Sequence, residues 1–398
     1  MRITLSLDDI CQSYRERMVS GKFAGSHDIF TPSSLVEEIL CHIPFLDNGK
    51  KILVMYTLEF ALNLVYTFKV DPKNIYVFVD HELKKKWAQK LGVNIIETLE
   101  NLDMKFDCVL ANPPYQAAKG ESATIWDNFV IKGMELAKDG GMVSMIHPPA
   151  WRKPGHYLWK IMTQDNQLVY VNINGEEKGN KIFNAGTRFD YYLIKKEKPT
   201  KETLVIDELG AETSIDLIGR ECLPNFGISI WDKITGSADQ KLLANHSYEC
   251  STLKSNLAHA DENHPYPQLT AMSKTGVPRY VYSKTPHTDQ YTKKVIFSDS
   301  RFLVPLFDVD AMLGASEHGI YIKVQNNKEG ENLVKYLKSD LIQFVVKATK
   351  WGNFQMLWTM FKYIDWPFSD FDEVTDDVIY SHFGITEEEI EFIEKQIR

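Results

Sequence analysis

The stretch KILVMYTLEFALNLVYTFKVDPKNIYVFVD, residues 51–80, contains the pattern that decides the fold. Residues 51–56 have the length of a strand and are continuously apolar after Lys51, and residues 58–68 are mostly apolar over the length of a helix. A second apolar run, residues 74–80, ends on an acid. Short continuous apolar runs are typical of strands buried on both faces. A strand, a covering helix and a second strand therefore predict a parallel sheet.

The same alternation continues along the chain. Further strands are expected at residues 93–96, 106–111, 142–146, 168–173 and 189–195, with helices at 83–91 and 125–137. Two helices are also expected ahead of the first strand, one from residue 7 and one after Pro32. Strands that alternate with helices of this length indicate an α/β fold with a mostly parallel sheet and helices on both faces.

The length of 398 residues exceeds what one ordinary domain requires. The apolar pattern stops at residues 195–202 (KKEKPTKE), so we expect N-terminal helices and the α/β domain in residues 1–197 and a mixed α+β domain in residues 198–364. Residues 365–398 form an acidic tail with a helix, holding eleven acidic and two basic residues. The first 364 residues hold 43 of each, so the net charge of −9 leaves room for a basic surface elsewhere.

Composition excludes several classes of protein. An apolar fraction of 44% and a charged fraction of 25% exclude a disordered or fibrous chain. The five cysteines form no CxxC pair, which argues against a disulfide framework or a metal site and suits a reducing cytoplasm. The N-terminus lacks the apolar core of a secretory signal, and the most apolar run, residues 52–68, contains Glu59 and Asn63. We therefore expect a cytoplasmic protein with no membrane segment.

The tetrapeptide Asn112-Pro113-Pro114-Tyr115 follows directly after the strand expected at residues 106–111. Two consecutive prolines hold the backbone extended and rigid at the mouth of the sheet, where open α/β folds bind ligands. The Asn112 amide oxygen and the Pro113 carbonyl are then two fixed acceptors for the two hydrogens of an exocyclic amino group. Tyr115 can stack on the flat ring that carries the amine. The structural alternative is a tight loop that closes a strand.

With this motif the chain resembles the N6-adenine DNA methyltransferases, in the arrangement where the catalytic domain precedes the target-recognition domain. The stand-alone enzymes of restriction-modification systems and phages are the most similar group. Phe30-Thr31-Pro32 is similar to the family's N-terminal cofactor motif, and the stretch from Gly140 through Trp151 and Arg152 is similar to its strand and loop after the catalytic motif. Residues 181–192 are similar to the stretch whose aromatic residue packs on a flipped base. The resemblance covers about residues 26–195.

The resemblance implies a Rossmann-like methyltransferase domain, S-adenosylmethionine as the methyl donor and adenine in double-stranded DNA as the acceptor. It also implies base flipping, because a duplex buries the adenine amino group. Asn112, Pro113, Pro114 and Tyr115 would be catalytic, and Phe183 would face Tyr115 across the adenine; the alternative for Phe183 is a core position. The resemblance places seven residues in the cofactor site: Phe30, Thr31, Pro32, Tyr56, Thr57, Asp80 and Asn112. For the ribose hydroxyls Glu82 is the alternative to Asp80, and the structural alternative for an acid at this strand end is a helix cap.

The chain departs from the family after the first strand, where a glycine-rich turn would let the cofactor approach the backbone. It reads VMYTLEF at residues 54–60, and no glycine occurs between Gly49 and Gly92. Side chains stand where glycine would leave room. Glu59 falls near the start of the following helix, where it either repels the carboxylate of the cofactor's methionine part or pairs with its α-ammonium.

The second domain contains basic residues interleaved with tyrosines, a composition that suits DNA phosphates but also ordinary surface loops. The DNA-binding candidates are Lys274, Arg279, Lys284, Lys293, Lys294 and Arg301. A smaller candidate patch comprises Lys347, Lys350 and Trp351.

The leading hypothesis is therefore a site-specific DNA adenine-N6 methyltransferase, with a cognate restriction endonuclease or a partner subunit as its candidate partner. The second is a catalytically inactive, DNA-binding or partner subunit whose cofactor pocket is blocked. An altered donor, a pocket completed by a partner, and methylation of RNA or of a glutamine amide are also compatible with the tetrapeptide alone.

Overall fold

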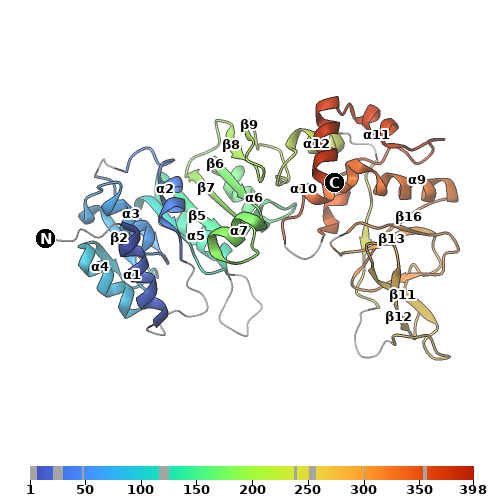
Figure 1. Ribbon diagram of the computed structural model, residues 1–398, viewed down its shortest axis with the longest axis horizontal. Helices are drawn as coiled ribbons and strands as arrows, with labels where there is room; N and C mark the ends of the chain where they lie inside the picture. The colour runs from blue at the N-terminus through green and yellow to red at the C-terminus, as the bar shows by residue number, and fades with distance from the viewer. Residues whose placement is uncertain are drawn as a thin grey trace. The chain divides into compact units, whose positions relative to one another are not determined.

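The computed structural model describes residues 7–20, 30–46, 49–115, 125–236, 240–250, 257–300, 302–352 and 356–398. The chain divides into two compact units, Met1–Cys222 and Leu223–Arg398 (Figure 1).

Unit 1 is built on a nine-stranded sheet with the order β3-β2-β1-β4-β5-β7-β6-β8-β9. The strands are β1 (Ile52–Met55), β2 (Ile75–Phe78), β3 (Asn94–Ile96), β4 (Phe106–Ala111), β5 (Ala137–His147), β6 (Gln167–Asn174), β7 (Phe189–Lys195), β8 (Thr203–Ile206) and β9 (Glu212–Ile215). Strands β3, β2, β1, β4 and β5 pair in parallel, whereas β7 runs antiparallel to both β5 and β6. The α/β fold expected from the sequence is confirmed.

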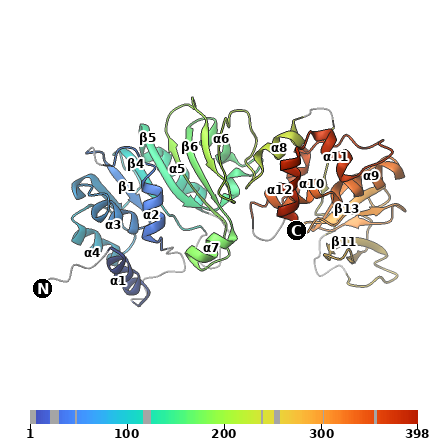
Figure 2. The ribbon, with the colours of Figure 1, turned by 45° about the horizontal axis from the view of Figure 1, so that its top comes forward.

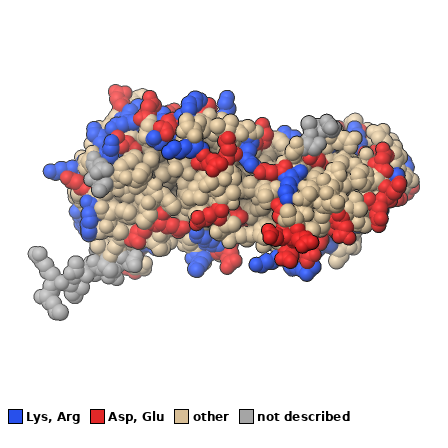
Figure 3. Space-filling model, turned by 90° about the horizontal axis from the view of Figure 1, so that it is seen from above, with Lys and Arg blue, Asp and Glu red and all other residues tan. Residues whose placement is uncertain are grey.

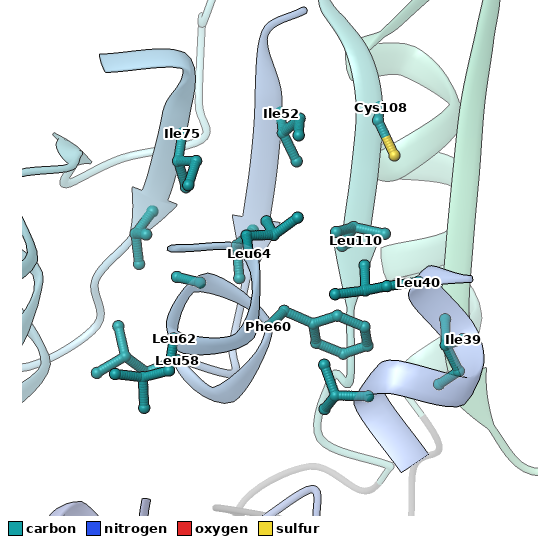
Figure 4. Packing of buried hydrophobic residues seen from close by; sticks show 14 of the residues in the cluster. Ile39, Leu40, Ile52, Leu58, Phe60, Leu62, Leu64, Ile75, Cys108 and Leu110 are labelled. Carbon is teal, nitrogen blue, oxygen red and sulfur yellow. The ribbon is translucent and has the colours of Figure 1, made fainter. Parts of the chain in front are cut away.

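Helices cover both faces of this sheet. They are α1 (Leu7–Ser20), α2 (Ser33–Leu40), α3 (Glu59–Tyr66), α4 (Glu82–Leu91), α5 (Trp126–Leu136), α6 (Tyr157–Thr163) and α7 (Glu176–Phe183), with short 3-10 turns at Pro72–Asn74 and Pro149–Arg152. Figure 4 shows Phe60 of α3 and Ile39 of α2 packed on the same face of the sheet as Ile52 and Leu110, and Figure 2 shows the two helices beside each other.

Helix α5 packs on the other face of the sheet, close to β4 and β5. A Cβ atom at Gly133 would lie 2.2 Å from the Met145 side chain and 3.4 Å from that of Val143. Val109 of β4 also borders this point, and its neighbours Cys108 and Leu110 belong to the core under α2 and α3. Because successive side chains of a strand point to opposite faces, α5 lies opposite α2 and α3.

The boundary between the units lies at residues 222/223, later than the 197/198 expected from the charged stretch. Strand β8 pairs in parallel with β6 and β9 pairs antiparallel with β8, so the sheet continues past this stretch. The expectation was wrong because the polar residues 196–202 form a surface connection between two strands of one sheet. Such a turn has the same composition as a linker.

Unit 2 contains a four-stranded sheet, β10-β16-β13-β14, and a three-stranded sheet, β12-β11-β15. The strands are β10 (Asn245–His246), β11 (Tyr266–Met272), β12 (Pro278–Ser283), β13 (Lys294–Ser298), β14 (Leu306–Asp308), β15 (Gly314–Ala315) and β16 (Gly319–Lys323). The helices are α8 (Ile228–Thr235), α9 (Asn327–Lys338), α10 (Asp340–Ala348), α11 (Asp376–Phe383) and α12 (Glu387–Ile397), with a 3-10 helix at Trp358–Tyr363. The expected α+β architecture is confirmed.

The acidic C-terminal residues are part of unit 2 and do not form a separate tail. Helix α12 begins with a capping box formed by Thr386 and Glu389, packs against α10, and buries Ile393 completely. Lys233 of α8 also pairs with Glu389 at 2.5 Å. In the view of Figure 3, acidic side chains gather on the right-hand part, which is unit 2. Within the described ranges, no helix is long and apolar enough to cross a membrane.

Candidate active site

The carboxyl ends of the parallel strands bring the expected site residues to one edge of the sheet. Tyr56 and Thr57 follow β1, Asp80 follows β2, and Asn112 follows β4. Because these three strands are adjacent and parallel, their ends meet at the same edge. This is the edge where open α/β sheets bind ligands.

Asn112 is held in place by Thr31, a residue 81 positions earlier in the chain. The Asn112 Nδ2 atom donates a hydrogen bond to Thr31 Oγ1 at 2.9 Å. Asn112 is 2% exposed and Thr31 is fully buried. The Asn112 Oδ1 atom is also buried, and no described residue donates to it. A buried amide oxygen left without a donor costs about 1–3 kcal/mol, so this acceptor is available for an N–H group of a ligand.

The remaining residues of the tetrapeptide continue away from this anchor. Pro113 is buried, whereas Pro114 and Tyr115 are partly exposed. The Tyr115 hydroxyl is buried and lacks a hydrogen-bond partner among the residues that the structure describes. Burial raises the pKa of this phenol, with a smaller contribution from Asp190, so Tyr115 stays neutral. The Ile125 N–H donates to the Tyr115 carbonyl at 3.3 Å, which ties the tetrapeptide to the start of α5.

A buried ion pair fixes the loop after β5. Arg152 donates from Nε and Nη2 to the two oxygens of Asp190, at 2.7 and 3.1 Å, and Trp151 Nε1 donates to Asp190 at 2.8 Å. Arg152 is 1% exposed and Asp190 is fully buried. The sequence indicated Trp151, Arg152 and the strand containing Asp190 but not their contact, because the partners lie 38 residues apart.

The end of β5 is packed by aromatic rings. His147 is fully buried, and its ring stacks on Trp126 of α5 with centroids 4.4 Å apart. Its Nε2 atom lies 3.0 Å from the Tyr192 hydroxyl. Burial lowers the pKa of His147 to about 3, so the ring is neutral and serves packing rather than acid–base exchange.

Phe183 ends α7, which follows β6 and therefore lies at the same edge of the sheet as Asn112. Its ring packs edge-on against Phe189, with centroids 5.0 Å apart, and borders the core of unit 1. Among the described side chains, no ring contact joins Phe183 to Tyr115. A role on a flipped base thus remains a prediction for Phe183.

The turn after β1 has an unusual backbone. Tyr56 has a φ of 65°, a left-handed conformation that L-residues rarely adopt and that glycine adopts readily. Its ring packs against Phe78 and Phe129, with centroids 5.1 and 4.6 Å away. The chain therefore keeps the backbone shape that a glycine would give, and places an aromatic side chain there.

Asp80 lies near this turn and is engaged by a buried lysine. Lys84 Nζ lies 2.9 and 3.1 Å from the two Asp80 oxygens and 3.4 Å from the Tyr56 carbonyl. The Lys84 side chain is 3% exposed, whereas that of Asp80 is 34% exposed. The Asp80 carboxylate is therefore partly exposed and could accept a hydrogen bond from a ribose hydroxyl while it stays paired with Lys84.

Glu59, the first residue of α3, is a buried carboxylate. It is 2% exposed, and its Oε2 atom accepts a hydrogen bond from Thr57 Oγ1 at 2.8 Å. Its Oε1 atom has no hydrogen-bond partner within the described ranges. Burial raises the pKa of Glu59, against smaller opposing effects of Thr57, Arg15 and the Thr31 backbone.

The motif Phe30-Thr31-Pro32 joins α1 to the active-site edge. Pro32 precedes α2, and its carbonyl accepts from the first backbone N–H groups of that helix. Phe30 packs edge-on against Tyr14 of α1, and the Arg15 guanidinium lies 5.8 Å from the Phe30 ring. Thr31 alone of the three contacts Asn112 by a hydrogen bond among the described interactions.

The structure separates the DNA-binding candidates of unit 2. Lys274, Arg279 and Lys284 are exposed on or beside the β11–β12 hairpin. Lys293 is partly exposed and bonds to Asn327 at 2.5 Å.

The other two candidates are Lys294 and Arg301. Lys294 is fully buried and donates to Asp308 and to three backbone carbonyls, so the prediction for Lys294 was wrong. A run of alternating basic residues does not reveal which lysine points inward from a strand. Arg301 lies outside the described residues.

Unit 2 also brings together two basic patches that are distant in sequence. Lys274, Lys347 and Lys350 line one cavity of about 440 Å³, together with Phe302 and Gln343. The Lys274 ammonium lies 5.5 Å from the Phe302 ring centre, within the range of a cation–π contact. Trp351 is instead buried and donates to the Leu223 carbonyl.

Comparison with known proteins finds a family match within unit 1. Residues 72–183 match the family described as Eco57I restriction-modification methylase. The matched stretch contains Asn112–Tyr115 and begins after the glycine-free turn. No sequence among the curated proteins matches the chain.

Solved structures with similar parts include methyltransferases and restriction-modification proteins. The type I restriction-modification methyltransferase subunit of Streptococcus thermophilus is 18% identical over 52% of this chain and 53% of its own, with a TM-score of 0.40. A class I S-adenosylmethionine-dependent methyltransferase of Listeria monocytogenes is 16% identical over 51% and 73%, also with a TM-score of 0.40. The type IIG restriction endonuclease BpuSI is 12% identical over 96% and 63%, with a TM-score of 0.46. The chain spans about half the length of the type I proteins that it resembles. Among these comparisons, the family match is that of residues 72–183 to the Eco57I restriction-modification methylase family.

Proposed function

We propose that this protein is a DNA methyltransferase of the restriction-modification type that transfers a methyl group from S-adenosylmethionine to N6 of an adenine flipped out of double-stranded DNA. The buried, unpaired Oδ1 atom of Asn112 carries the proposal, because it is a fixed acceptor at the ligand-binding edge of the sheet. The family match of residues 72–183 supports it. A cognate restriction endonuclease or partner subunit is the expected companion.

The chain's own groups position and polarise the amine. Asn112 Oδ1 and the Pro113 carbonyl accept the two N6 hydrogens, which directs the nitrogen lone pair toward the methyl group. Tyr115, and on the far side Phe183, hold the flipped ring. The donor supplies an electrophilic methyl group on a sulfonium. Orientation and electrostatic stabilisation of the developing charge on N6 are then sufficient, and a strong general base is unnecessary.

The residues at the edge of the sheet fit such a donor at its amino acid end. Glu59 Oε1 is a buried acceptor without a hydrogen-bond donor in the described part of the chain, and the Thr31 backbone lies near this carboxylate. Thr31 also holds the Asn112 amide through its Nδ2 atom. On the other side, Tyr56, Thr57 and Asp80 would line the nucleoside. These residues, with Phe30 and Pro32, would hold the cofactor.

The variant Asn112→Ala tests the proposal. Loss of this acceptor should lower methyl transfer about 100- to 1,000-fold, because it removes a preorganised partner of the transition state. The affinity for DNA should change by less than about threefold, since most of that affinity comes from phosphate contacts. The measurement is transfer of label from S-adenosylmethionine to N6 of adenine in mixed-sequence DNA, beside a DNA titration. Weak DNA binding with normal turnover of bound DNA would contradict the proposal.

The second candidate function is an inactive DNA-binding or partner subunit. It is favoured by the Tyr56 ring in the β1–α3 turn and by the Lys84–Asp80 pair beside it. Calorimetry with S-adenosylmethionine separates the two functions. Absence of binding at millimolar donor favours the inactive subunit, and a saturating isotherm removes it.

A further inference from the structure

Glu59 and Arg15 form an incomplete ion pair beside the active-site edge. Arg15 Nε lies 3.9 Å from Glu59 Oε1, which is too long for a hydrogen bond. Both atoms are buried, and neither has a hydrogen-bond partner among the described residues. A carboxylate and a guanidinium that nearly touch, each with a buried hydrogen-bonding atom left unused, are costly to leave without a ligand.

The two groups differ in how they are held. Glu59 is fixed on the first turn of α3. Thr57 Oγ1 donates to one of its carboxylate oxygens, and the Asn63 side chain donates to the Glu59 backbone carbonyl. Arg15 comes from α1 and is partly open, with a side chain 28% exposed. It lines a cavity of about 540 Å³ together with Pro32 and Ser33. The free oxygen of Glu59 and the guanidinium of Arg15 thus form a negative and a positive group side by side, with Arg15 at the cavity and Glu59 buried.

A ligand that carries adjacent positive and negative charges would satisfy both groups. The methionine end of a sulfonium methyl donor is such a zwitterion, with an α-ammonium and an α-carboxylate on one carbon. We propose that Glu59 accepts the α-ammonium and Arg15 binds the α-carboxylate of the donor, in place of the backbone contacts that a glycine-rich turn would give. This inference rests on the proposed function, because it takes S-adenosylmethionine as the donor.

The electrostatics of Glu59 give a second readout. Burial raises its pKa, and the charged or polar groups that face it in the described residues are Arg15, Thr57, Thr31 and Asn63. A bound ammonium favours the ionised carboxylate and lowers this pKa again. Binding should therefore release protons at a pH where the free protein holds part of its Glu59 protonated. Affinity for the donor should fall as the pH drops through that range.

The test compares S-adenosylhomocysteine with 5′-methylthioadenosine, which lacks the amino acid end, by calorimetry on the full chain. The wild type should bind S-adenosylhomocysteine at least about tenfold more tightly, a difference of about 1.4 kcal/mol. Glu59→Gln and Arg15→Gln should each lower that affinity about tenfold and change the affinity for methylthioadenosine by less than about twofold. Glu37→Gln is the matched control, because Glu37 lines the same cavity and should change neither.

Measuring proton release requires only the wild type, so it tests the inference even if the variants fold poorly. Titrations at a series of acidic to neutral pH values, each in two buffers of different ionisation enthalpy, should show proton release with S-adenosylhomocysteine within this range and none with methylthioadenosine. Equal losses for both nucleosides in Glu59→Gln, or no loss for either, would overturn the inference. A wild type that binds neither nucleoside overturns both the inference and the proposed donor. A wild type that discriminates as expected but leaves no label on adenine overturns the proposed function alone.

Discussion

Glu59 should lower the stability of the free protein at neutral pH, because its carboxylate is buried with one oxygen unsatisfied. Its raised pKa means that the folded state binds its proton more tightly than the unfolded state does. Relative to high pH, protonation of Glu59 therefore stabilises the folded state. This stabilisation is complete below the pKa of Glu59 in the unfolded state and is lost as the pH rises through its pKa in the folded state.

The variant Glu59→Gln should then be about 1–3 kcal/mol more stable to unfolding than the wild type at pH 8, a magnitude typical of an unsatisfied buried group. The difference should shrink toward pH 4, where both states of the wild type become protonated. Urea unfolding at the two pH values measures it. A Gln variant that is less stable than the wild type at pH 8 would show that the ionised carboxylate is stabilised by groups other than those described.

The sequence predicted Asn112 and its neighbours as site residues because the tetrapeptide fixes its own backbone. It did not predict which groups would hold Asn112, Glu59 and Asp80. Their partners Thr31, Arg15 and Lys84 are ordinary residues whose proximity arises from the packing of helices on the sheet. Local pattern carries no information on such contacts, except that a buried carboxylate in an apolar helix, such as Glu59, signals an unseen partner.

Helix α7 is fitted against the loop that follows it. A Cβ atom at Gly179 would lie 1.9 Å from the backbone oxygen of Thr187, whereas one at Gly186 would meet nothing closer than 3.6 Å. Helix α7 therefore holds its place, and that of Phe183 at its end, only because residue 179 is glycine.

The variant Gly179→Ala should displace α7 and destabilise the protein by about 1–3 kcal/mol, since a backbone clash cannot be relieved by a side-chain rotation. Gly186→Ala is the matched control and should stay within about 0.5 kcal/mol of the wild type. Thermal unfolding measures both. If Phe183 holds the flipped base, Gly179→Ala should also weaken methyl transfer while S-adenosylhomocysteine affinity is unchanged; equal stability of the two variants would contradict the packing argument.

Strands β1 to β7 and helices α1 to α5 of unit 1 were predictable because buried strands and amphipathic helices have distinct apolar periods, whereas α6 and α7 were not predicted. The turn after β1 was not. Tyr56 adopts a left-handed backbone that its residue type disfavours, and its aromatic contacts with Phe78 and Phe129 hold it there. Strands β8 and β9 were missed because they are short, and three of the four β9 residues are exposed.

At the scale of the whole molecule, the acidic residues of the C-terminal stretch 365–398 and the basic DNA-binding candidates both belong to unit 2. Lys274, Arg279 and Lys284 are exposed near one hairpin and are free to meet phosphates. The logarithm of the affinity for DNA falls as the logarithm of the salt concentration rises. If each residue contacts one phosphate, replacing all three with Ala should make this negative slope shallower by about 2.7, because each lost contact accounts for about 0.9.

Fluorescence titration with duplex DNA at several salt concentrations measures this slope. Turnover at saturating DNA should be unchanged in the triple variant, since these residues lie in the other unit from Asn112. Lys338→Ala is the control, because Lys338 is an exposed lysine on α9 away from the hairpin strands, and it should leave the slope unchanged. An unaltered slope in the triple variant would remove the hairpin from the DNA-contacting surface.

The pairing of β8 with β6 decides where the chain can be truncated without exposing the edge of a strand. A recombinant fragment that stops at residue 197 would leave β6 with an open row of backbone donors and acceptors, and such rows recruit other chains into aggregates. A fragment that stops at residue 222 keeps β8 on that edge and β9 beyond it. The longer fragment should remain monomeric in size-exclusion chromatography, and the shorter one should elute as oligomers or precipitate.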